Sequence, residues 1–338
     1  MEIKRLWLNR DPDMYAKWAE LLGRAYLVAD DQVDFSIGFF DGEKLIATGA
    51  IFQNILKCIA IDPKYQNENL LTQVIQKLRE QLQEVGYTHY FLYTKPSVKY
   101  LFKSLGFSEI IATEELIFME QGFPDFNDYL NEIKQFKQST HENAGIVMNA
   151  NPFTNGHLYL ITEAAKKNET VYVFVVSEDR SLFDTATRFR LVVEGVKELK
   201  NVVVLPTREY IVSSATFPSY FLKDQAKASV AKVQAKLDAA LFKNRIAPIL
   251  EITSRFVGEE PFSPVTEMYN QAMKDSFLDN LDLVILPRKQ AAGEVISASR
   301  VRSLLVKKDE QTLKKLVPET TFKELMKYKK IRGVHFGN

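Results

Sequence analysis

The sequence predicts an α/β protein of two domains, in which a smaller α+β domain precedes a parallel sheet with helices on both faces. Three observations predict this arrangement. A length of 338 residues favours two domains over one. Strands and helices alternate after about residue 140, as a parallel sheet with crossover helices requires. Before it, Asp41-Gly42 between two apolar runs is a strong hairpin signal. We therefore divide the chain into residues 1–140 and 141–338.

The composition indicates a soluble chain with no overall field for a charged partner. The formal net charge is +1, so we expect neither nucleic acid nor a membrane as partner. Cys58 is the single cysteine, which excludes an internal disulfide and fits a reducing compartment. No apolar stretch reaches the ~20 residues of a membrane span, and Met1–Trp7 is too short and too charged for a signal peptide. We expect a cytoplasmic protein.

Residues 1–140 carry the signals of strands mixed with helices. A helix at Asp11–Ala25 begins with Asp-Pro, which supplies an N-cap and a proline at the first helical position. Val74, Leu78 and Leu82 recur on one face of a helix at Leu70–Val85. The other elements expected here are strands at 2–8, 36–40, 44–52, 55–61, 90–93 and 116–119, and helices at 100–106 and 126–136.

Residues 141–338 alternate between short apolar strands and helices. Open sheets of this kind bind ligands beyond the carboxyl ends of their strands. We expect strands at 146–148, 170–176, 202–205, 249–257 and 282–286, and helices at 158–167, 185–199, 225–243, 264–274 and from 297 onward.

The loop between the strand Ile146–Met148 and the following helix is the first candidate site. Pro152 ends the strand because it cannot donate to a ladder, and Gly156 lets another group approach the backbone closely. His157 falls in the first helical turn, where unpaired N–H groups and the helix dipole attract anions. We expect Thr154, Gly156 and His157 to bind phosphate oxygens, although such residues are also ordinary in turns.

A second helix start lies near the C-terminus. Pro287 ends the strand at 282–286, and either Ser297 or Ser299 can cap the helix that follows. Arg302 lies one turn into that helix, where its guanidinium can bind an anion with two hydrogen bonds. Two helix starts that attract anions therefore belong to one domain.

The two segments, Thr154-x-Gly-His157 and Ile296-Ser-x-Ser-x-x-Arg302, resemble the signature pair of the nucleotidyltransferase superfamily. The chain resembles the citrate lyase ligase family more closely, over residues 1 to about 330. This resemblance implies that residues 141–338 form a Rossmann-like nucleotidyltransferase domain. The further segments that carry it are Asn149–Thr154, Phe174–Asp179, Tyr210–Ser213, Ala215–Lys223, Arg255–Phe262 and Val265–Asn270.

The resemblance implies an AMP-forming acid–thiol ligase. Acetate and ATP would form enzyme-bound acetyl-AMP with release of pyrophosphate. The acetyl group would then pass to the thiol of the dephospho-CoA-type prosthetic group on the acyl carrier subunit of citrate lyase, which activates the lyase. Mg²⁺ would bind mostly through the phosphates and water. We expect no protein metal site, because His89, His141 and His335 have no second ligand at metal spacing.

This chemistry assigns roles to the residues of both helix starts. An ionised carboxylate needs no base to attack the α-phosphate, so the protein must position the reactants and neutralise charge. We expect Thr154, His157 and Arg302 to be catalytic, with Ser299 and Arg302 on the β- and γ-phosphates and Arg300 as an alternative cation. By location alone, His157 is also the candidate base for the thiol. The expected ATP-binding residues are Asn149, Asn151, Pro152, Phe153, Thr154, Gly156, His157, Ser297, Ser299, Arg300 and Arg302.

Other charged residues follow the expected strands of the second domain. We expect Arg255 and Glu259 to line the substrate site, since they lie at the end of a strand and in the loop after it. Asp179, Arg180 and Arg188 either line the site or form a solvated charged face.

The order of elements in residues 1–140 resembles the GNAT-like acyl-CoA N-acetyltransferase fold, which implies acetyl-CoA as a ligand of this domain. The pyrophosphate loop of that fold would lie at Gln66–Leu71. The fold requires small residues where this chain has Asn69 and Leu71, because backbone N–H groups must approach the pyrophosphate without a Cβ in the way. Gln66 matches the pattern. We therefore expect a retained fold with a docking or regulatory role rather than catalytic acetyl transfer.

Two alternative functions remain open from the sequence. One is an adenylyltransferase that acts on phosphopantetheine or nicotinate mononucleotide and shares both segments. The other is a regulatory protein that senses acyl-CoA through residues 1–140.

Overall fold

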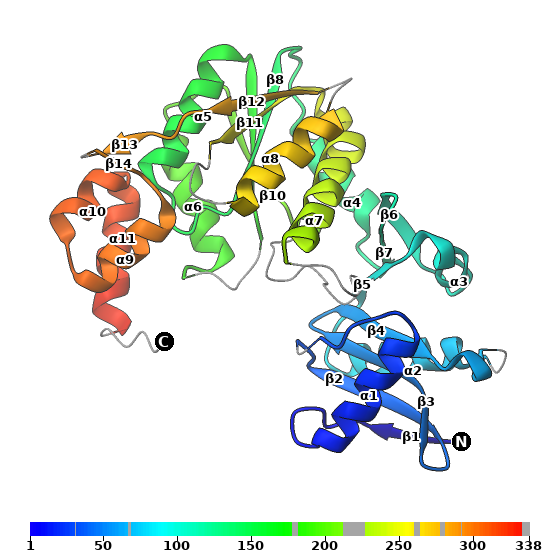
Figure 1. Ribbon diagram of the computed structural model, residues 1–338. Helices are drawn as coiled ribbons and strands as arrows, with labels where there is room; N and C mark the ends of the chain where they lie inside the picture. Colours follow the sequence, from blue (N-terminus) through cyan, green and yellow to red (C-terminus); the bar gives the residue numbers. More distant parts are fainter. Residues whose placement is uncertain are drawn as a thin grey trace. The chain divides into compact units, whose positions relative to one another are not determined.

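The computed structural model describes residues 1–30, 32–66, 69–177, 182–211, 227–259, 264–277, 281–291 and 293–332. These residues form two compact units (Figure 1). Unit 1 contains Met1–Asp128 and helix α7 (Lys227–Leu241). Unit 2 contains the described residues from Tyr129 to Ile211 and from Phe242 to Arg332.

The division between the units differs from the single boundary near residue 140 that the sequence predicts. Helix α4 (Phe126–Lys134) crosses the division, and the Tyr129 hydroxyl donates to the carbonyl of Pro206 at 3.2 Å within unit 2. Helix α7 belongs to unit 1 because it contacts strand β6 there and Lys236 pairs with Glu115 at 2.6 Å. A segment far along the chain therefore completes the first unit.

Unit 1 is built on a seven-stranded sheet in the order β1-β2-β3-β4-β5-β7-β6. Neighbouring strands are antiparallel except β4 and β5, which are parallel and pair only at Ile55–Phe91 and Leu56–Leu92. This mixed sheet confirms the α+β class. The strands are β1 (Glu2–Arg5), β2 (Phe35–Asp41), β3 (Lys44–Phe52), β4 (Ile55–Ile61), β5 (His89–Thr94), β6 (Ser108–Ala112) and β7 (Ile117–Gly122).

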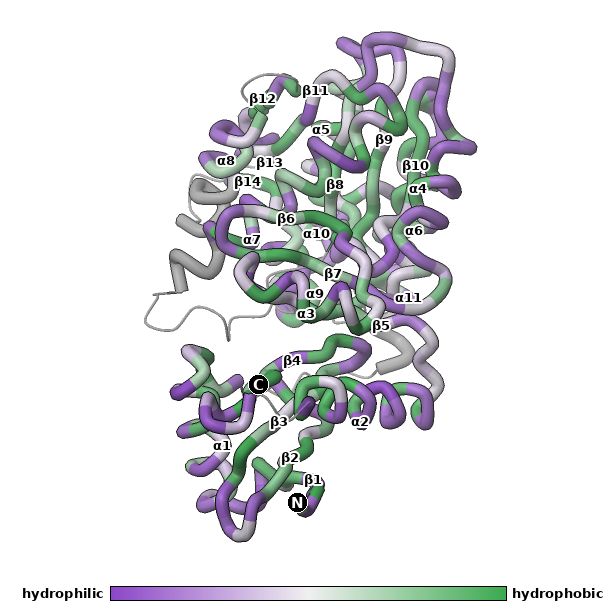
Figure 2. Tube along the Cα trace, turned by 90° about the vertical axis from the view of Figure 1, so that its right-hand side faces the viewer, coloured by the Kyte–Doolittle hydropathy of each residue, from purple (hydrophilic) through white to green (hydrophobic). Residues whose placement is uncertain are grey.

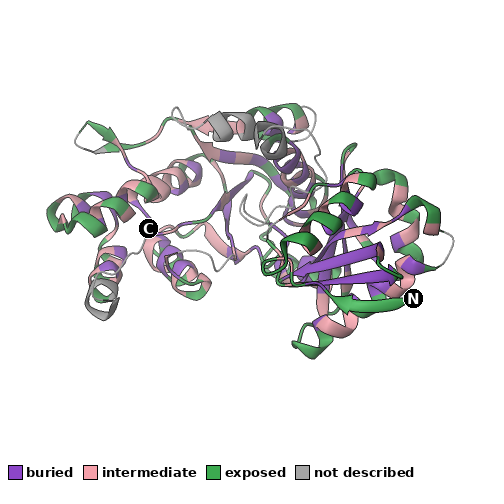
Figure 3. Cartoon of the chain, turned by 60° about the horizontal axis from the view of Figure 1, so that its bottom comes forward, coloured by how far each residue is buried: buried purple, intermediate pink, exposed green. Residues whose placement is uncertain are grey.

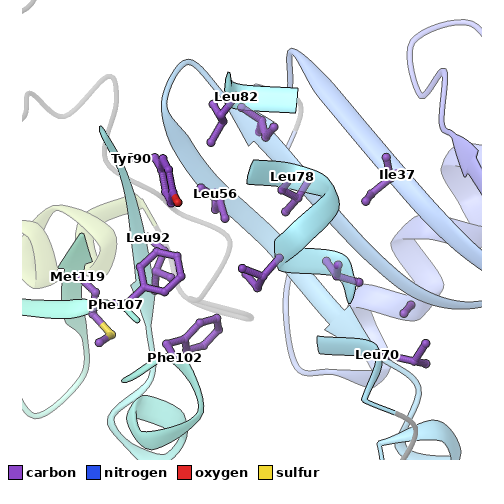
Figure 4. Close-up of a cluster of buried hydrophobic side chains, with 14 of the residues drawn as sticks. Ile37, Leu56, Leu70, Leu78, Leu82, Tyr90, Leu92, Phe102, Phe107 and Met119 are labelled. Atoms are coloured by element: carbon purple, nitrogen blue, oxygen red, sulfur yellow. The ribbon is translucent and has the colours of Figure 1, made fainter. Parts of the chain in front are cut away.

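Two amphipathic helices cover opposite faces of this sheet. Helix α1 (Pro12–Arg24) begins as predicted, with the Asp11 side chain accepting from the Met14 amide at 2.9 Å. Successive strand residues point to opposite faces, so Phe40 packs with α1 while Phe39 packs with α2 (Leu70–Glu84). Figure 4 shows the cluster under α2, and α2 alternates between hydrophilic and hydrophobic stretches in Figure 2. The short helix α3 (Lys99–Ser104) completes the unit.

Unit 2 contains a five-stranded sheet in the order β10-β9-β8-β11-β12, in which all pairs are parallel. The strand order reverses between β8 and β11, which is the arrangement that opens a ligand crevice at the carboxyl ends of the strands. This sheet confirms the Rossmann-like class. The strands are β8 (Asn143–Met148), β9 (Thr170–Val175), β10 (Val202–Pro206), β11 (Ile252–Gly258) and β12 (Asp282–Leu286).

Helices α5 (Asn155–Lys167) and α6 (Thr185–Val196) pack on one face of this sheet around Ile146 and Val173. The turn Phe242–Ile246 lies on the other face, where Phe242 meets Phe174 at a ring-centroid separation of 5.9 Å. Strands β8 and β9 in the centre of the sheet are largely buried, whereas β10 and β12 at its edges are mostly of intermediate exposure (Figure 3). The remaining elements are α8 (Pro264–Phe277), β13 (Gln290–Ala291), β14 (Glu294–Val295), α9 (Ala298–Lys307), α10 (Glu310–Leu316) and α11 (Glu319–Arg332).

Two predicted positions are wrong, that of the hairpin turn and that of the start of β11. The hairpin is present, but Asp41 pairs with Lys44, so its two-residue turn is Gly42–Glu43 with Gly42 at φ +59°. Strand β11 begins at Ile252 instead of residue 249, because Pro248 and its neighbours form a short 3₁₀ turn. Proline favours such a turn because it cannot donate to a ladder.

The buried Trp18 side chain depends on one acceptor in unit 1. Its Nε1 donates to Thr48 Oγ1 at 3.1 Å, and that hydroxyl donates to the Ile37 carbonyl at 2.8 Å. We expect Thr48→Val to lower the free energy of unfolding of unit 1 by about 1–3 kcal/mol, because a buried donor loses its partner in an almost unchanged volume. Urea unfolding followed by Trp18 fluorescence in a Trp7→Phe background measures this loss. An unchanged midpoint in Thr48→Val would show that the hydrogen bond contributes nothing.

Candidate functional site

The first candidate helix start is closed by a reciprocal cap between Thr154 and His157. Thr154 is the N-cap of α5, and its Oγ1 accepts from the His157 amide at 3.3 Å. In return, the Thr154 amide donates to Nδ1 of His157 at 3.0 Å. Because Nδ1 is the acceptor, the neutral ring carries its proton on Nε2. Within the described residues Nε2 makes no hydrogen bond, so it is the atom that can donate to a ligand.

The surroundings of His157 keep its ring neutral. Burial, and secondarily the charge of Arg288, lower the pKa of His157 from 6.5 to about 4. A neutral imidazole whose Nδ1 is engaged and whose Nε2 bears the proton can donate a hydrogen bond, but it has no lone pair with which to remove a proton. This hydrogen-bonding pattern argues against His157 as the base for a thiol.

The second helix start lies directly against the first. Ser297 is the N-cap of α9, since its Oγ accepts from the Arg300 amide at 3.1 Å. Ser299 is exposed on the first turn. A Cβ on Gly156 would lie 3.2 Å from the carbonyl oxygen of Ile296. The close approach expected at Gly156 is therefore made by the backbone that leads into the second segment.

A hydrogen bond from Arg302 joins the two segments. Its Nη1 donates to the carbonyl of Asn151 at 2.6 Å and its Nη2 to Ser299 Oγ at 3.0 Å. Burial lowers the pKa of Arg302 from its ordinary value. The structure thus brings the imidazole of His157 and the guanidinium of Arg302 to one edge of the sheet, beyond the carboxyl end of β8.

Two polar atoms near this junction have no hydrogen-bond partner among the residues that the structure describes. They are Oδ1 of Asn151 and Nη1 of Arg300, and both are buried. The other nitrogen of that guanidinium, Nη2, pairs with Glu294 at 2.7 Å. A buried acceptor and a buried donor left unsatisfied are costly, and they fit a site completed by a polar ligand.

Arg188 on α6 anchors the first loop; the sequence left it open whether this residue lines the site or belongs to a solvated charged face. Its side chain is 0% exposed, so the alternative of a solvated charged face is wrong. Nη1 donates to the carbonyl and Oδ1 of Asn149 at 2.8 and 2.9 Å and to the carbonyl of Val176 at 2.7 Å. The Nε of Arg188 also donates to the carbonyl of Phe183 at 3.1 Å. One side chain therefore fixes the loops that follow β8 and β9.

The Phe153 ring packs against the imidazole of His157. The two rings are stacked, with centroids 5.8 Å apart and planes inclined by 11°. A Cβ on Gly195 of α6 would lie 2.4 Å from the Phe153 ring, so glycine is required there for the ring to fit. Pro152, between Asn151 and Phe153, is also buried.

Of the two residues expected to line a substrate site, Arg255 lies within strand β11 and only Glu259 follows it. Arg255 is in the middle of β11, three residues before the strand ends, and its guanidinium lies 4.0 Å from the Phe242 ring centroid. The prediction that it lies at the sheet edge is wrong because β11 continues to Gly258. Glu259 does follow the strand, and its carbonyl accepts from Arg288 Nε at 2.7 Å.

Arg288 is a further cation of the site that sequence reasoning missed. It follows β12 directly, and it is close enough to His157 to affect the pKa of the ring. The next residue, Lys289, lies 5.8 Å from the ring of Tyr159 on α5. The signal available in the sequence was the position of Arg288 after Pro287, at the carboxyl end of a predicted strand.

The loop that corresponds to the acyl-CoA pyrophosphate site lies in unit 1 and is only partly described. Gln66 ends a short 3₁₀ turn, and Leu71 packs partly buried against the core under α2. Asn69 has φ +53° and precedes α2. Asparagine tolerates this left-handed conformation, so the backbone turn is kept without glycine. Asp179, Arg180, residues 212–226 and Glu260 belong to predicted segments outside the described residues.

The arrangement in unit 2 can bind a polyphosphate. Two helix N-termini meet at Gly156 and Ile296, the charge of Arg288 acts on the neutral ring of His157, and Arg300 and Arg302 lie near the start of α9. No group of three or more His, Cys, Asp or Glu side chains that could hold a metal ion occurs in the described ranges. In the same ranges, no helix has the length and apolar character needed to cross a membrane.

Comparisons with known proteins show which family the chain resembles. Residues 143–325 match the family described as citrate lyase ligase C-terminal domain. The chain is 37% identical over 331 residues to the citrate (pro-3S)-lyase ligase of Klebsiella pneumoniae, covering 96% of each chain. It is 38% identical over 314 residues to the protein of the same name from Escherichia coli K12, covering 90% of this chain and 88% of the relative.

Two solved structures have a lower similarity. Thermotoga maritima TmcAL bound with α-thio ATP is 17% identical and covers 55% of each chain with a TM-score of 0.35. The ribosomal-protein-S18-alanine N-acetyltransferase of Escherichia coli is 18% identical and covers 36% of this chain and 92% of that chain with a TM-score of 0.30.

The protonation state of His157 can be measured directly. We expect its imidazole to remain neutral through pH 7 and to titrate near pH 4 in an NMR titration, with the resonance assigned by its absence in His157→Asn. Since the unfolded chain takes up this proton first, the linked stability is complete above pH 6.5 and is lost as the pH falls toward 4. Arg288→Met should raise the pKa of His157. A titration near 6.5 in the folded protein would contradict the assigned environment.

The role of Arg188 can be separated from that of its neighbour on α6. We expect Arg188→Met to lower the free energy of unfolding of unit 2 by about 3 kcal/mol or more, because buried carbonyls lose their donor. The matched control is Arg190→Met two residues away, where exposed pairs with Glu194 and Glu324 contribute about 0–1 kcal/mol. Urea unfolding measures both variants. Equal losses of free energy of unfolding in Arg188→Met and Arg190→Met would show that the buried hydrogen bonds contribute no more than the exposed ion pairs.

Proposed function

The chain belongs to the citrate lyase ligase family, and from this premise we propose that it acetylates the prosthetic-group thiol on the acyl carrier subunit of citrate lyase. Its relatives of 37% and 38% identity are named ligases of that lyase, so the chain is a ligase. In the proposed reaction acetate attacks the α-phosphate of ATP, pyrophosphate leaves, and the acetyl group of acetyl-AMP passes to the thiol with release of AMP. The acetylated subunit then makes the lyase active.

The observation that carries this proposal is the junction of the two helix starts at Gly156 and Ile296. A triphosphate at this junction would lie within the field of two helix N-termini and three arginines. The Nε2–H of His157 would donate to a non-bridging oxygen of the α-phosphate, where negative charge changes during attack. Because the ring is neutral and held by Thr154, the donor is oriented before the substrate arrives.

The arginines would bind the departing phosphates. Arg302 is held by Asn151 and Ser299, and a ligand that takes up one of these hydrogen bonds would keep the guanidinium satisfied. Arg300 offers the buried Nη1, and the carboxamide of Asn151 offers a buried acceptor. Mg²⁺ would neutralise the phosphates when bound, mainly through phosphate oxygens and water.

Unit 1 has, in this proposal, no acetyltransferase activity of its own. The Leu71 side chain stands where the acetyltransferase pattern requires a small residue, and it packs against the core. Acetyl-CoA stays a proposed ligand of this unit, in a docking or regulatory role. The use of ATP and the single buried thiol of Cys58 support a cytoplasmic location.

The decisive experiment adds ATP, Mg²⁺ and acetate to the protein and measures pyrophosphate, and then adds thiol-form citrate lyase and measures its recovered activity. We expect acetate-dependent pyrophosphate release and activation of the lyase. Release that ignores acetate and requires a phosphorylated cosubstrate such as phosphopantetheine or nicotinate mononucleotide would replace the proposal with an adenylyltransferase. Heat from acetyl-CoA without any pyrophosphate release would favour a regulatory protein.

His157 provides a specific test of the adenylation step. We expect His157→Ala to lower kcat for acetate-dependent pyrophosphate release by about 10²-fold, because a preoriented donor to the transition state is lost. In His157→Asn the shorter side chain still offers an acceptor to the Thr154 amide but lacks the Nε2 donor. We therefore expect its kcat to be as low as that of His157→Ala. Recovery of the rate by His157→Asn would assign the effect to the helix cap. His141→Ala, at an exposed histidine, serves as the unaffected control.

A further inference from the structure

The positive charge of the chain is concentrated in one segment of unit 2. Residues 298–332 contain 11 of the 44 lysines and arginines but only four of the 43 aspartates and glutamates. The segment therefore carries a formal charge of about +7 in a chain whose total is +1. The overall composition conceals this asymmetry.

This segment forms the three helices α9, α10 and α11, which pack together (Figure 1). Val301, Leu305 and Leu313 lie in the buried cluster between them. Four exposed lysines lie at the C-terminal ends of α9 and α10, after the buried residues of these helices. We call them the lysine face, and they are Lys307, Lys308, Lys314 and Lys315.

The lysine face is only partly balanced by its surroundings: Asp309 lies between its two pairs of lysines, and hydrogen bonds from Thr312 and, to a smaller degree, the charge of Lys315 lower the pKa of that carboxyl. None of its four ammonium groups forms an ion pair in the part of the protein that the structure describes, whereas Lys323 and Lys327 of α11 lie 3.7 Å from Glu319 and Glu324. The dipoles of α9 and α10 stabilise a lysine in the last turn of each, by about 0.3–1 kcal/mol. Each helix end thus carries a pair of lysines where one would suffice, although like charges repel.

An apolar side chain lies beside the lysines. Val306 is 47% exposed and directly precedes Lys307. Protein interfaces combine an apolar centre with a charged, solvent-accessible rim. The combination fits the surface of a folded partner better than a free small anion.

The lysine face borders the candidate site. The carbonyl of Lys315 accepts from Nδ2 of Asn155 at 3.0 Å, and Asn155 is the first residue of α5. Arg302 lies on the same helix as Lys308, about 9 Å away along the axis at the usual rise per residue. A partner protein bound to the lysine face would therefore lie close to the candidate site.

We propose that the lysine face is the docking surface for the acyl carrier subunit, recognised as an acidic protein surface that presents a phosphate-bearing thiol arm. This inference rests on the proposed function and extends it to the second half-reaction. The charged face would accelerate encounter with an anionic partner, while the arm enters the neighbouring site. A nucleic acid would also be attracted to such a face, but the remainder of the chain, with a formal charge of about −6, would repel it.

The test uses the full chain with Lys308→Glu and Lys315→Glu combined. We expect the KM for thiol-form citrate lyase to rise about tenfold and to lose most of its dependence on ionic strength, since charges at an interface rim act mainly on association. Acetate-dependent exchange between pyrophosphate and ATP should stay within about twofold, because the first half-reaction does not involve the partner. The matched control combines Lys167→Glu and Lys200→Glu, two exposed lysines that lie at the last residue of α5 and shortly before β10.

The outcomes separate this inference from the proposed function. Absence of acetate-dependent exchange in the unmodified protein would overturn the proposed function itself. Normal exchange with an unchanged KM for the lyase in Lys308→Glu/Lys315→Glu, or an equal rise in Lys167→Glu/Lys200→Glu, would overturn the docking surface. Binding of duplex RNA of unrelated sequence as tightly as the lyase, abolished by the same reversal, would assign the face to nucleic acid and also overturn it.

Discussion

The close contact between Gly156 and Ile296 is the constraint on which the candidate site depends. Each helix start by itself is a common feature of α/β proteins, and each offers a few unpaired N–H groups. The missing side chain at Gly156 lets the backbone before α9 lie against the start of α5. Arg302 then reaches the Asn151 carbonyl at 2.6 Å, so segments about 150 residues apart become one surface. Without this contact, there would be two separate helix starts in place of the single site that we propose for a triphosphate.

Apart from the ion pair of Arg300 with Glu294, the arginines near the site are held by hydrogen bonds, several of them to backbone carbonyls. Arg188 donates hydrogen bonds to carbonyls in the loops after β8 and β9, and Arg288 donates one to the carbonyl of Glu259. Carbonyl partners orient a guanidinium without cancelling its charge. The positive potential is therefore available to a polyphosphate, and it contributes to the low pKa of His157. The same potential that favours the substrate keeps the imidazole a neutral donor.

Local signals predicted much of this structure. The N-cap at Asp11 was predicted, and Ser297 was one of the two candidate caps of the second helix start. The cap at Thr154 was not predicted, because the helix was expected to begin at residue 158 instead of Asn155. The role of Arg188 was left open and Arg288 was not identified, because a single arginine has no periodicity and its burial depends on loops that fold around it from elsewhere in the chain. Arg255 was misplaced because β11 starts and ends later than its apolar run suggests. The helices α10 and α11 were not predicted, although the excess of lysine there was visible in the sequence.

Helix α7 has a consequence for the order in which the protein can fold during synthesis. It follows β10 of the second unit in the sequence, yet its contacts with β6 and its Lys236–Glu115 pair belong to the first unit. The amino-terminal unit is therefore incomplete when its own strands have left the ribosome, and it must wait until about a hundred further residues have been translated. Nascent chains of this protein would pass through a stage in which three strands of the second sheet exist before the first unit is covered.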